Sequence, residues 1–148
     1  DGLTKLFPRP ETLASAELDS IGMPGKRVAA LQRLSAAVAN GALELHIEDG
    51  SDALVRRLCE LPGIGPWTAE YIALRGFGEA DAFPAADLGL LKAPLWGRNG
   101  LTPRELRARS HTWRPWRAYA AVYIWNNYGI SSLQAKAGES SSAPAAGP

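Results

Sequence analysis

The sequence predicts an all-α fold. Apolar residues recur at intervals of three or four along several segments, which is the spacing of one face of a helix. Prolines and glycines stand between these segments, where helices begin and end. No segment shows the sustained apolar and polar alternation that predicts strands. The 148 residues correspond to about one domain, and 46% hydrophobic with 21% charged residues can build a core.

Two helices are predicted in the first 60 residues. The segment Val28–Val38 places apolar residues on one face and ends near Gly41, which suits a helix terminus. Ser51 is a typical N-cap residue for the next helix. That helix carries on one side Leu54, Leu58 and Leu61.

Two more helices follow. Pro66 suits the first turn of a helix that reaches Leu74 and stops at Gly76. The sequence Thr102-Pro-Arg-Glu105 has the spacing of a capping box, with proline at the first helical position.

The last helix is predicted from Pro115 through Tyr128, and Gly129 closes it. From Ala135 the composition turns to Ala, Gly, Ser and Pro, which cannot build a core. We therefore expect one domain over residues 1–130 and a flexible tail over 131–148.

Composition excludes several kinds of site. The single cysteine, Cys59, excludes an internal disulfide and a four-cysteine iron–sulfur cluster, and two histidines do not favour a zinc site. No apolar run approaches the ~20 residues of a membrane-spanning helix, and the start of the chain does not resemble a secretory signal. The net charge is +1, but Arg98–Arg117 holds six arginines and one acid. This segment fits a contact with a polyanion and a solvated helical face equally well.

A glycine-rich turn, Leu61-Pro62-Gly63-Ile64-Gly65, lies between the second and third predicted helices. Its two glycines permit positive φ and close approach of another backbone, and Ile64 would be buried. The free N–H groups that begin the next helix can bind a phosphate. A plain connection between two antiparallel helices explains the bare turn better.

Together with the residues that follow it, this hairpin resembles the helix-hairpin-helix DNA glycosylases. The segments LPGIGPWTAEYIALRGFG and FPAADLGL are similar to the alkylpurine branch, the 3-methyladenine DNA glycosylases. The similarity extends to LFPRPETLASA and GMPGKRVAAL before the hairpin and to TWRPWRAYAAVYIW after it. It implies the helical core of that fold without the family's usual N-terminal domain.

Asp87 is the candidate catalytic residue, because the resemblance matches it to an invariant aspartate of the family. Base removal passes through an oxocarbenium-like sugar, whose charge a carboxylate can stabilise while it orients or deprotonates the water. An N-alkylated purine leaves readily as a cation and needs little general acid. Aspartate before Leu88 is also typical of a helix N-cap, and this alternative stays open. Asp81, six residues earlier, is interpreted as a loop acid.

The resemblance implies that Trp67, Tyr71 and Trp125 surround the base pocket. Aromatic rings suit an electron-poor purine, through stacking and cation–π attraction. Aromatic residues at helical spacing are more often part of a core. We apply that interpretation to several of the others, which are Trp96, Trp113, Trp116, Tyr119 and Tyr123.

Two kinds of binding are implied for the hairpin. Gly63 and Gly65 would present backbone N–H groups to phosphates of one DNA strand, assisted by the Thr68 side chain. Family members also hold a monovalent cation at this turn. We therefore expect Na⁺ or K⁺, and no other cofactor, on the backbone carbonyls of Cys59, Leu61 and Ile64.

The function that the resemblance implies is that of a monofunctional DNA glycosylase of base excision repair. Such an enzyme hydrolyses the N-glycosidic bond of 3-methyladenine-type purines flipped out of double-stranded DNA. Relatives that also cleave the strand carry a lysine where Trp67 stands, so we expect no AP-lyase step. We expect a monomer without membrane contact, in the cytoplasm or nucleoid of a bacterium or the nucleus of a eukaryote. The alternative is a non-catalytic helix-hairpin-helix DNA-binding module, or an inactive fragment of such a glycosylase.

Overall fold

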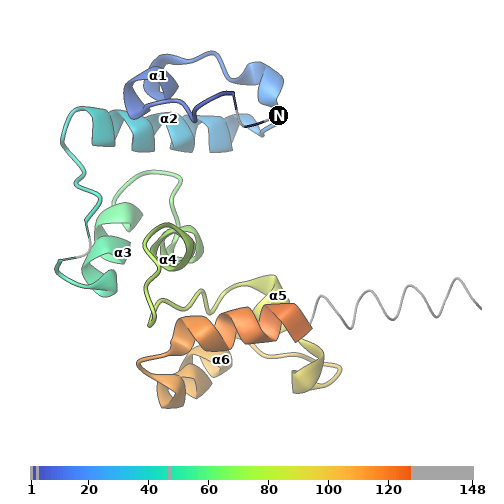
Figure 1. The fold of residues 1–148 in the computed structure, drawn as a ribbon. Coiled ribbons are helices and arrows are strands. Elements are labelled where there is room, and N and C mark those ends of the chain that lie inside the picture. Colours follow the sequence, from blue (N-terminus) through green and yellow to red (C-terminus); the bar gives the residue numbers. More distant parts are fainter. Residues whose placement is uncertain (1, 3, 47, 128–148) are drawn as a thin grey trace, which may run out of the picture. The chain divides into compact units, whose positions relative to one another are not determined.

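The computed structural model describes residues 2, 4–46 and 48–127. All regular secondary structure within these residues is helical, and they contain no strand (Figure 1). The predicted all-α class is confirmed. The chain divides into two compact units, Asp1–Ala73 and Leu74–Pro148, with the boundary inside helix α4 (Pro66–Gly76). The tail predicted over 131–148 lies outside the described residues. Within the described part, no helix has both the length and the apolar character needed to cross a membrane.

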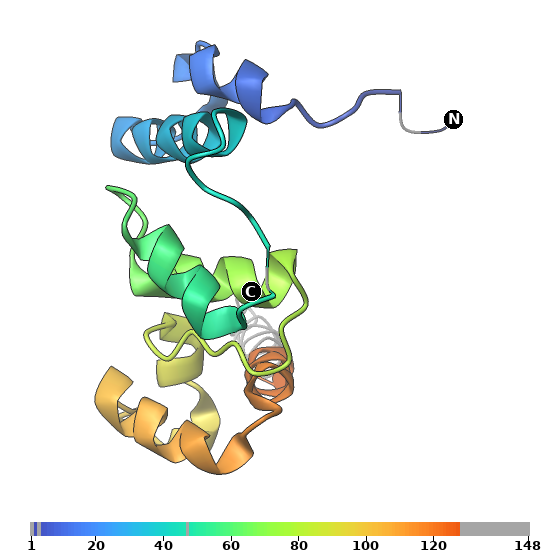
Figure 2. The same ribbon diagram turned by 90° about the vertical axis from the view of Figure 1, so that its left-hand side faces the viewer.

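The first unit begins with α1 (Pro10–Ser15), the 3-10 helix η1 (Asp19–Ile21) and α2 (Gly25–Ala39). Figures 1 and 2 both show α1 lying along α2. A side-chain amide holds the two together, because Gln32 Nε2 donates to the Ala16 carbonyl at 3.0 Å. The helix predicted over Val28–Val38 is therefore confirmed as α2, and Gly41 follows it at φ 74°.

The hairpin joins α3 (Ser51–Cys59) to α4. The predicted inner face of α3 is confirmed at Leu54 and Leu58, which are fully buried. The prediction that Ser51 caps this helix is wrong. Gly50 is the N-cap, at φ 84° and without a side-chain bond, so Ser51 is already the first helical residue. The glycine is needed there because few other residues adopt positive φ.

The second unit contains α5 (Leu88–Leu91), η2 (Pro94–Trp96), α6 (Pro103–Ser110), η3 (His111–Trp113) and a helix over 117–127. The last helix was predicted from Pro115 and starts two residues later, while its predicted end lies outside the described residues. The core of this unit is apolar. It includes fully buried side chains from four segments, namely Phe83, Leu90, Leu106 and Ala121.

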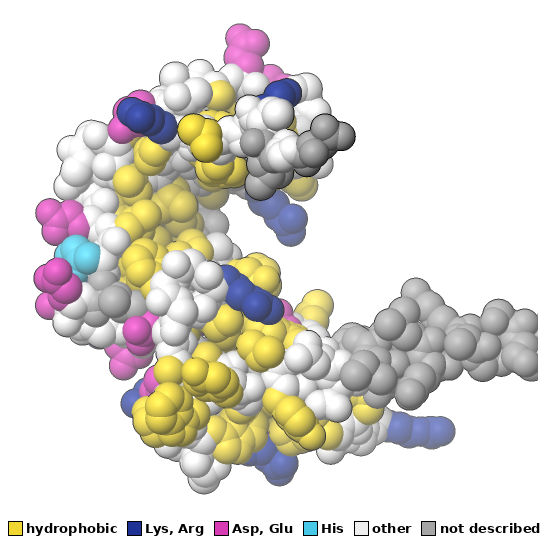
Figure 3. Space-filling view, viewed as in Figure 1, with side chains coloured by type: hydrophobic (Ala, Val, Ile, Leu, Met, Phe, Trp, Pro, Cys, Tyr) yellow, Lys and Arg dark blue, Asp and Glu magenta, His cyan; other side chains and the backbone are white. Residues whose placement is uncertain are grey.

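The aromatic residues of this unit divide into two groups. Trp96 and Trp113 are half-buried and stacked, with ring centroids 6.5 Å apart. The other three are exposed, with exposed fractions of 59%, 67% and 69% for Trp116, Tyr119 and Tyr123, so the core interpretation, made for several of the five, does not apply to them. The helix over 117–127 buries instead the face that carries Ala118, Ala121 and Ile124. Figure 3 shows hydrophobic side chains gathered on the surface of this part of the chain.

The predicted capping box at the start of α6 is confirmed. Thr102 Oγ1 accepts the Glu105 backbone N–H at 3.2 Å, and Glu105 Oε2 accepts the Thr102 backbone N–H at 2.8 Å. The bond from the Thr102 backbone, followed by that from its hydroxyl, lowers the pKa of Glu105 below its ordinary value. The cap therefore joins a helix end to an ionised carboxylate.

We expect Thr102→Ala to lower the free energy of unfolding by about 0.5–2 kcal/mol, because it removes an N-cap acceptor. The bond from the Thr102 backbone N–H to Glu105 remains in the variant, so the pH-dependent part is the bond from the Thr102 hydroxyl to the Glu105 carboxylate, at 2.7 Å. This part is present above the ordinary pKa of Glu105. It is lost as the pH falls through the lowered folded value, so the difference between parent and variant should shrink in acid. Thr112→Ala is the matched control, because its hydroxyl donates only to the Arg109 carbonyl outside any N-cap. Chemical denaturation at several pH values measures both, and equal losses would contradict the cap.

Candidate active site

Asp87 ends the segment that leads from α4 to α5 and is the N-cap of α5. Its Oδ1 accepts the backbone N–H of Leu90 at 3.1 Å. The same oxygen accepts the indole N–H of Trp125 at 2.8 Å. The helix-cap alternative is therefore a structural fact, while the catalytic role of this carboxylate stays a prediction.

Trp125 comes from the helix over 117–127 and is half-buried. The guanidinium of Arg75 lies 5.4 Å from the centroid of its ring, within reach of a cation–π contact. Trp125 and Asp87 are 38 residues apart in the sequence. The sequence predicted both as site residues, but their direct bond is a finding of the structure.

Gly89 is a residue of this site that the sequence analysis missed. A Cβ built on it would lie 3.1 Å from Asp87 Oδ1 and 3.2 Å from Trp125 Cδ1. Glycine therefore lets the indole and the carboxylate meet over the first turn of α5. A signal was available, because glycine inside the run Leu88–Leu91 costs helix stability and often marks a close approach.

Trp67 and Tyr71 lie on the part of α4 that belongs to the first unit. Their rings stack with centroids 5.6 Å apart, and the side chains are 43% and 38% exposed. Trp67 also borders a groove of about 500 Å³ between α2 and the hairpin, whose other lining residues include Arg27, Leu31, Gly63 and Thr68. The predicted base-pocket residues thus form two pairs in different units, and their assembly into one pocket stays a prediction.

Gly63 is required by the packing of the hairpin on α2. Its φ is 97°, and a Cβ there would come within 2.8 Å of the Ala30 Cβ. Arg33 Nη1 donates to the Pro62 carbonyl at 3.4 Å beside this contact. The predicted burial of Ile64 is confirmed at 7% exposure. The first glycine of the hairpin therefore serves the fold.

No packing contact among the described residues requires glycine at position 65. Its φ is not positive, and a Cβ built on it meets no atom within 4 Å. It immediately precedes α4, which begins with Pro66, a residue without an N–H group, and the Gly65 carbonyl accepts the Ala69 N–H at 3.0 Å. The second glycine therefore leaves room for a group from outside at the start of α4, with Thr68 half-buried one turn further on.

The carbonyls predicted to bind a cation lie at the end of α3 and in the turn. Cys59 is the last residue of α3, where carbonyls lack intrahelical partners, and the Leu61 carbonyl accepts the Ile64 N–H at 3.0 Å. Burial, and then the charge of Glu70, raises the pKa of the Cys59 thiol. That thiol stays protonated and does not compete as a ligand. Carbonyl oxygens are hard donors that suit Na⁺ or K⁺, so the residues fit the group.

Asp81 is more than the loop acid that the sequence suggested. Its carboxylate accepts Nε–H and Nη2–H of Arg117 at 2.7 and 2.9 Å, and Arg114 Nε lies 3.5 Å away. Arg117 is only 7% exposed. Another residue of the arginine-rich segment, Arg109, lies over the Trp96 ring at 5.0 Å. Arg109 and Arg117 therefore make contacts within the second unit. Neither the polyanion interpretation nor the solvated-face interpretation of this segment predicted them.

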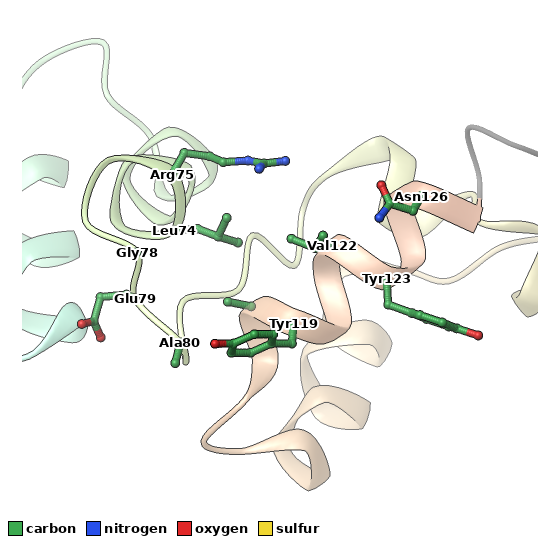
Figure 4. Close-up of a pocket in the computed structure, with 10 residues that line it drawn as sticks. Leu74, Arg75, Gly78, Glu79, Ala80, Tyr119, Val122, Tyr123 and Asn126 are labelled. Atoms are coloured by element: carbon green, nitrogen blue, oxygen red, sulfur yellow. The ribbon is translucent and has the colours of Figure 1, made fainter.

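A groove of about 530 Å³ lies elsewhere on the second unit, between residues 74–80 and the helix over 117–127 (Figure 4). Tyr119 and Tyr123 border it, together with Leu74, Arg75 and Val122. Neither Asp87 nor Trp125 is among the residues that line it. The candidate catalytic pair is therefore not part of this groove.

No family model matches the chain. The chain is 40% identical over 126 residues to DNA-3-methyladenine glycosylase 2 of Escherichia coli, and the match covers 83% of this chain and 43% of that protein. It is 41% identical over 123 residues to the probable bifunctional transcriptional activator/DNA repair enzyme AlkA of Mycobacterium tuberculosis, covering 83% of this chain and 25% of that protein. The chain thus spans less than half the length of these curated relatives.

Two solved structures share the fold. The 3-methyladenine DNA glycosylase of Schizosaccharomyces pombe, in complex with abasic DNA, matches with a TM-score of 0.68 and 23% identity over 80% of this chain and 62% of that one. A DNA-3-methyladenine glycosidase of Bacillus halodurans gives the same score and identity over 86% and 62%. The resemblance inferred from the sequence, and with it the helix-hairpin-helix glycosylase core, is confirmed.

A double-mutant cycle tests the central contact of the site. We expect Asp87→Ala and Trp125→Phe to couple by about 1–2 kcal/mol in the free energy of unfolding, because each removes one partner of a charge-assisted hydrogen bond. The loss of the α5 helix cap does not contribute to the coupling energy, because Asp87→Ala removes this cap both in the parent and in the Trp125→Phe variant. The same cycle between Trp125→Phe and Thr102→Ala is the control and should be additive within about 0.5 kcal/mol. Additivity at Asp87 as well would show that the bond contributes nothing.

Proposed function

Because the chain is related in sequence to the 3-methyladenine DNA glycosylases and shares their fold, we propose that it is the base-excising helical portion of such an enzyme. Its reaction is hydrolysis of the N-glycosidic bond of an alkylated purine that has been flipped out of double-stranded DNA. The observation that carries the proposal is the bond between Asp87 and Trp125. It joins a carboxylate suited to the sugar and an aromatic ring suited to the base.

The proposed chemistry needs a fixed negative charge more than a proton donor. Alkylation at purine N3 or N7 makes the base cationic, so the glycosidic bond breaks while positive charge develops on the sugar. Asp87 would stabilise that charge and orient the attacking water. Trp125, Trp67 and Tyr71 would hold the electron-poor base by stacking. With Trp67 in place of a lysine, the product is an abasic site in an intact strand.

The hairpin is the proposed grip on the DNA backbone. The start of α4, next to Gly65, can bind a phosphate without a charged side chain, through the positive end of the helix dipole, and the Thr68 hydroxyl would add a contact. The carbonyls of Cys59, Leu61 and Ile64 would hold a sodium or potassium ion, which supplies positive charge beside the phosphate when bound. No other cofactor is proposed.

The partner that follows is double-stranded DNA with alkylated bases, bound by a monomer. We place the protein with that DNA, in the cytoplasm or nucleoid of a bacterium or in the nucleus of a eukaryote. A non-catalytic DNA-binding module is the second candidate. It is favoured by one observation, namely that Asp87 already serves as a helix cap.

We expect Gly65→Val to weaken binding to duplex DNA at least about tenfold and to make the salt dependence shallower by about one phosphate contact. The variant should stay folded, because Gly65 lacks a positive φ and an added Cβ meets no described atom within 4 Å. Gly25→Val is the matched control, being another open glycine without positive φ. Binding measured across salt concentrations decides the matter. Unchanged affinity and slope for Gly65→Val would leave the hairpin as a connection only.

The catalytic assignment is tested by Asp87→Asn in a single-turnover assay of base release from methylated DNA. Asparagine caps a helix as well as aspartate does, and its amide oxygen can still accept the Trp125 indole N–H. The variant should therefore stay folded and lose no more than about 1 kcal/mol of stability. Removal of the charge should slow release on the order of a hundredfold. Asp19→Asn, an exposed acid of the first unit, is the control and should match the parent. No adduct should be trapped with borohydride.

Two results would contradict these assignments in different ways. An Asp87→Asn variant as fast as the parent would remove the catalytic role of the aspartate. A parent that binds DNA but releases no alkylated base would favour the non-catalytic module.

A further inference from the structure

We propose that the Asp81–Arg117 ion pair is a positioning clamp for the candidate catalytic pair. It fixes the segment before α5 on the helix over 117–127 and thereby sets where the Asp87 carboxylate meets Trp125. Asp81 and Arg117 are thus positioning residues that touch neither base nor sugar. The consequence for base release rests on the proposed function, whereas the consequence for the Asp87–Trp125 bond rests on geometry alone.

The two contacts join the same two pieces of the second unit. Asp81 and Asp87 are six residues apart on the connecting segment, and Arg117 and Trp125 are eight apart on the helix. Eight helical residues span about 12 Å, so the contacts hold the segment at two well-separated points. Beside the first of them, the Ala118 backbone N–H donates to the Ala80 carbonyl at 2.9 Å. The register between segment and helix is therefore fixed at Asp81.

The chain between the two contacts is rigid enough to carry that register to Asp87. Residues 82–85 are all buried, with exposures of 1% at Ala82 and 2% at Phe83. Two backbone hydrogen bonds of 2.8 Å close tight turns in this segment. The Ala85 N–H donates to the Phe83 carbonyl, and the Asp87 N–H donates to the Pro84 carbonyl. A close-packed and hydrogen-bonded segment transmits a displacement at one end to the other.

The tolerance at the second contact is small. A Cβ at Gly89 would lie 3.1 Å from the carboxylate oxygen and 3.2 Å from the indole, so both groups would have to move slightly to admit it. A shift of the segment along the helix would therefore lengthen the bond of 2.8 Å between Trp125 and Asp87. Displacements on the order of 1 Å can cost a reaction about a hundredfold in rate.

The ion pair is poorly explained by stability alone. Removal of charges from water costs about as much as their attraction returns, so well-packed apolar residues often replace a buried pair without loss of stability. What apolar residues cannot reproduce is the planar, two-bond geometry between a guanidinium and a carboxylate. That geometry defines a position, which a clamp requires.

The decisive variant replaces the pair as a whole, by Asp81→Leu together with Arg117→Met. It leaves no unpaired buried charge, so it should fold with stability close to the parent. Its first readout is hydrogen exchange of the Trp125 indole N–H, followed by NMR and identified by its absence in Trp125→Phe. We expect this proton to exchange at least about tenfold faster than in the parent. Thr102→Ala, which weakens the same unit away from the clamp, is the control for loss of stability.

The second readout is base release from methylated DNA. We expect the single-turnover rate constant to fall at least about tenfold, while affinity for the DNA changes less than about twofold. Arg117→Lys, which keeps the charge but not the two parallel bonds, should lie between parent and double variant in both readouts. A purely structural pair would instead give a loss that follows unfolding free energy across all variants.

The outcomes separate the clamp from the proposed function. If the double variant is stable and its Trp125 indole N–H exchanges as slowly as in the parent, the clamp is disproved, whatever the enzyme activity. If exchange accelerates but the parent releases no alkylated base, the clamp stands and the proposed function fails. If the double variant unfolds, Arg117→Lys replaces it as the test. Its Trp125 indole N–H should exchange faster than that of Thr102→Ala when the two variants have equal stability. Equal exchange rates would disprove the clamp.

Discussion

The second unit depends on the bond between the Trp125 indole and the Asp87 carboxylate. It fastens the last described helix to the start of α5, and it gives one oxygen, Oδ1, two N–H donors at 2.8 and 3.1 Å. Two donors on one oxygen fix the orientation of a carboxylate more firmly than a helix cap alone. The arrangement favours glycine at position 89, because a Cβ there would lie 3.1 Å from Asp87 Oδ1 and 3.2 Å from Trp125 Cδ1. The feature that makes Asp87 a good cap is thus the one that makes it a well-oriented charge.

The hairpin shows that two glycines in one motif can answer to different constraints. Gly63 combines a positive φ with a close approach to Ala30, so the chain itself requires it. Gly65 lacks a positive φ, and a Cβ built on it meets no described atom within 4 Å, so packing among the described residues does not explain it. The sequence analysis gave both glycines the same role, because the sequence alone does not distinguish between the two constraints. Only coordinates separate a glycine that the fold needs from one that leaves room for a ligand.

What could be predicted from the sequence follows the range of each interaction. The capping box of α6 was predictable because both partners lie within four residues. The helices and the buried Ile64 follow from local periodicity, and Asp87 and Trp125 from the resemblance. The ion pair of Asp81 was missed because Arg117 stands 36 residues away. The core interpretation was made for several of five aromatic residues and could not single out Trp116, Tyr119 and Tyr123 as exposed. Periodicity shows that a helix has faces, but not which face the rest of the unit covers.

The geometry of Asp87 also bears on which kind of catalysis suits it. A general base must give up or rearrange hydrogen bonds as its proton arrives, whereas a fixed charge acts without reorganisation. Oδ1 is held by two donors that belong to the fold, and moving it would break both the cap of α5 and the link to Trp125. An alkylated purine is a good leaving group, so its departure needs no strong acid. Under the proposed function, the fixed Oδ1 suits charge stabilisation at the sugar, because that role requires no movement of the carboxylate.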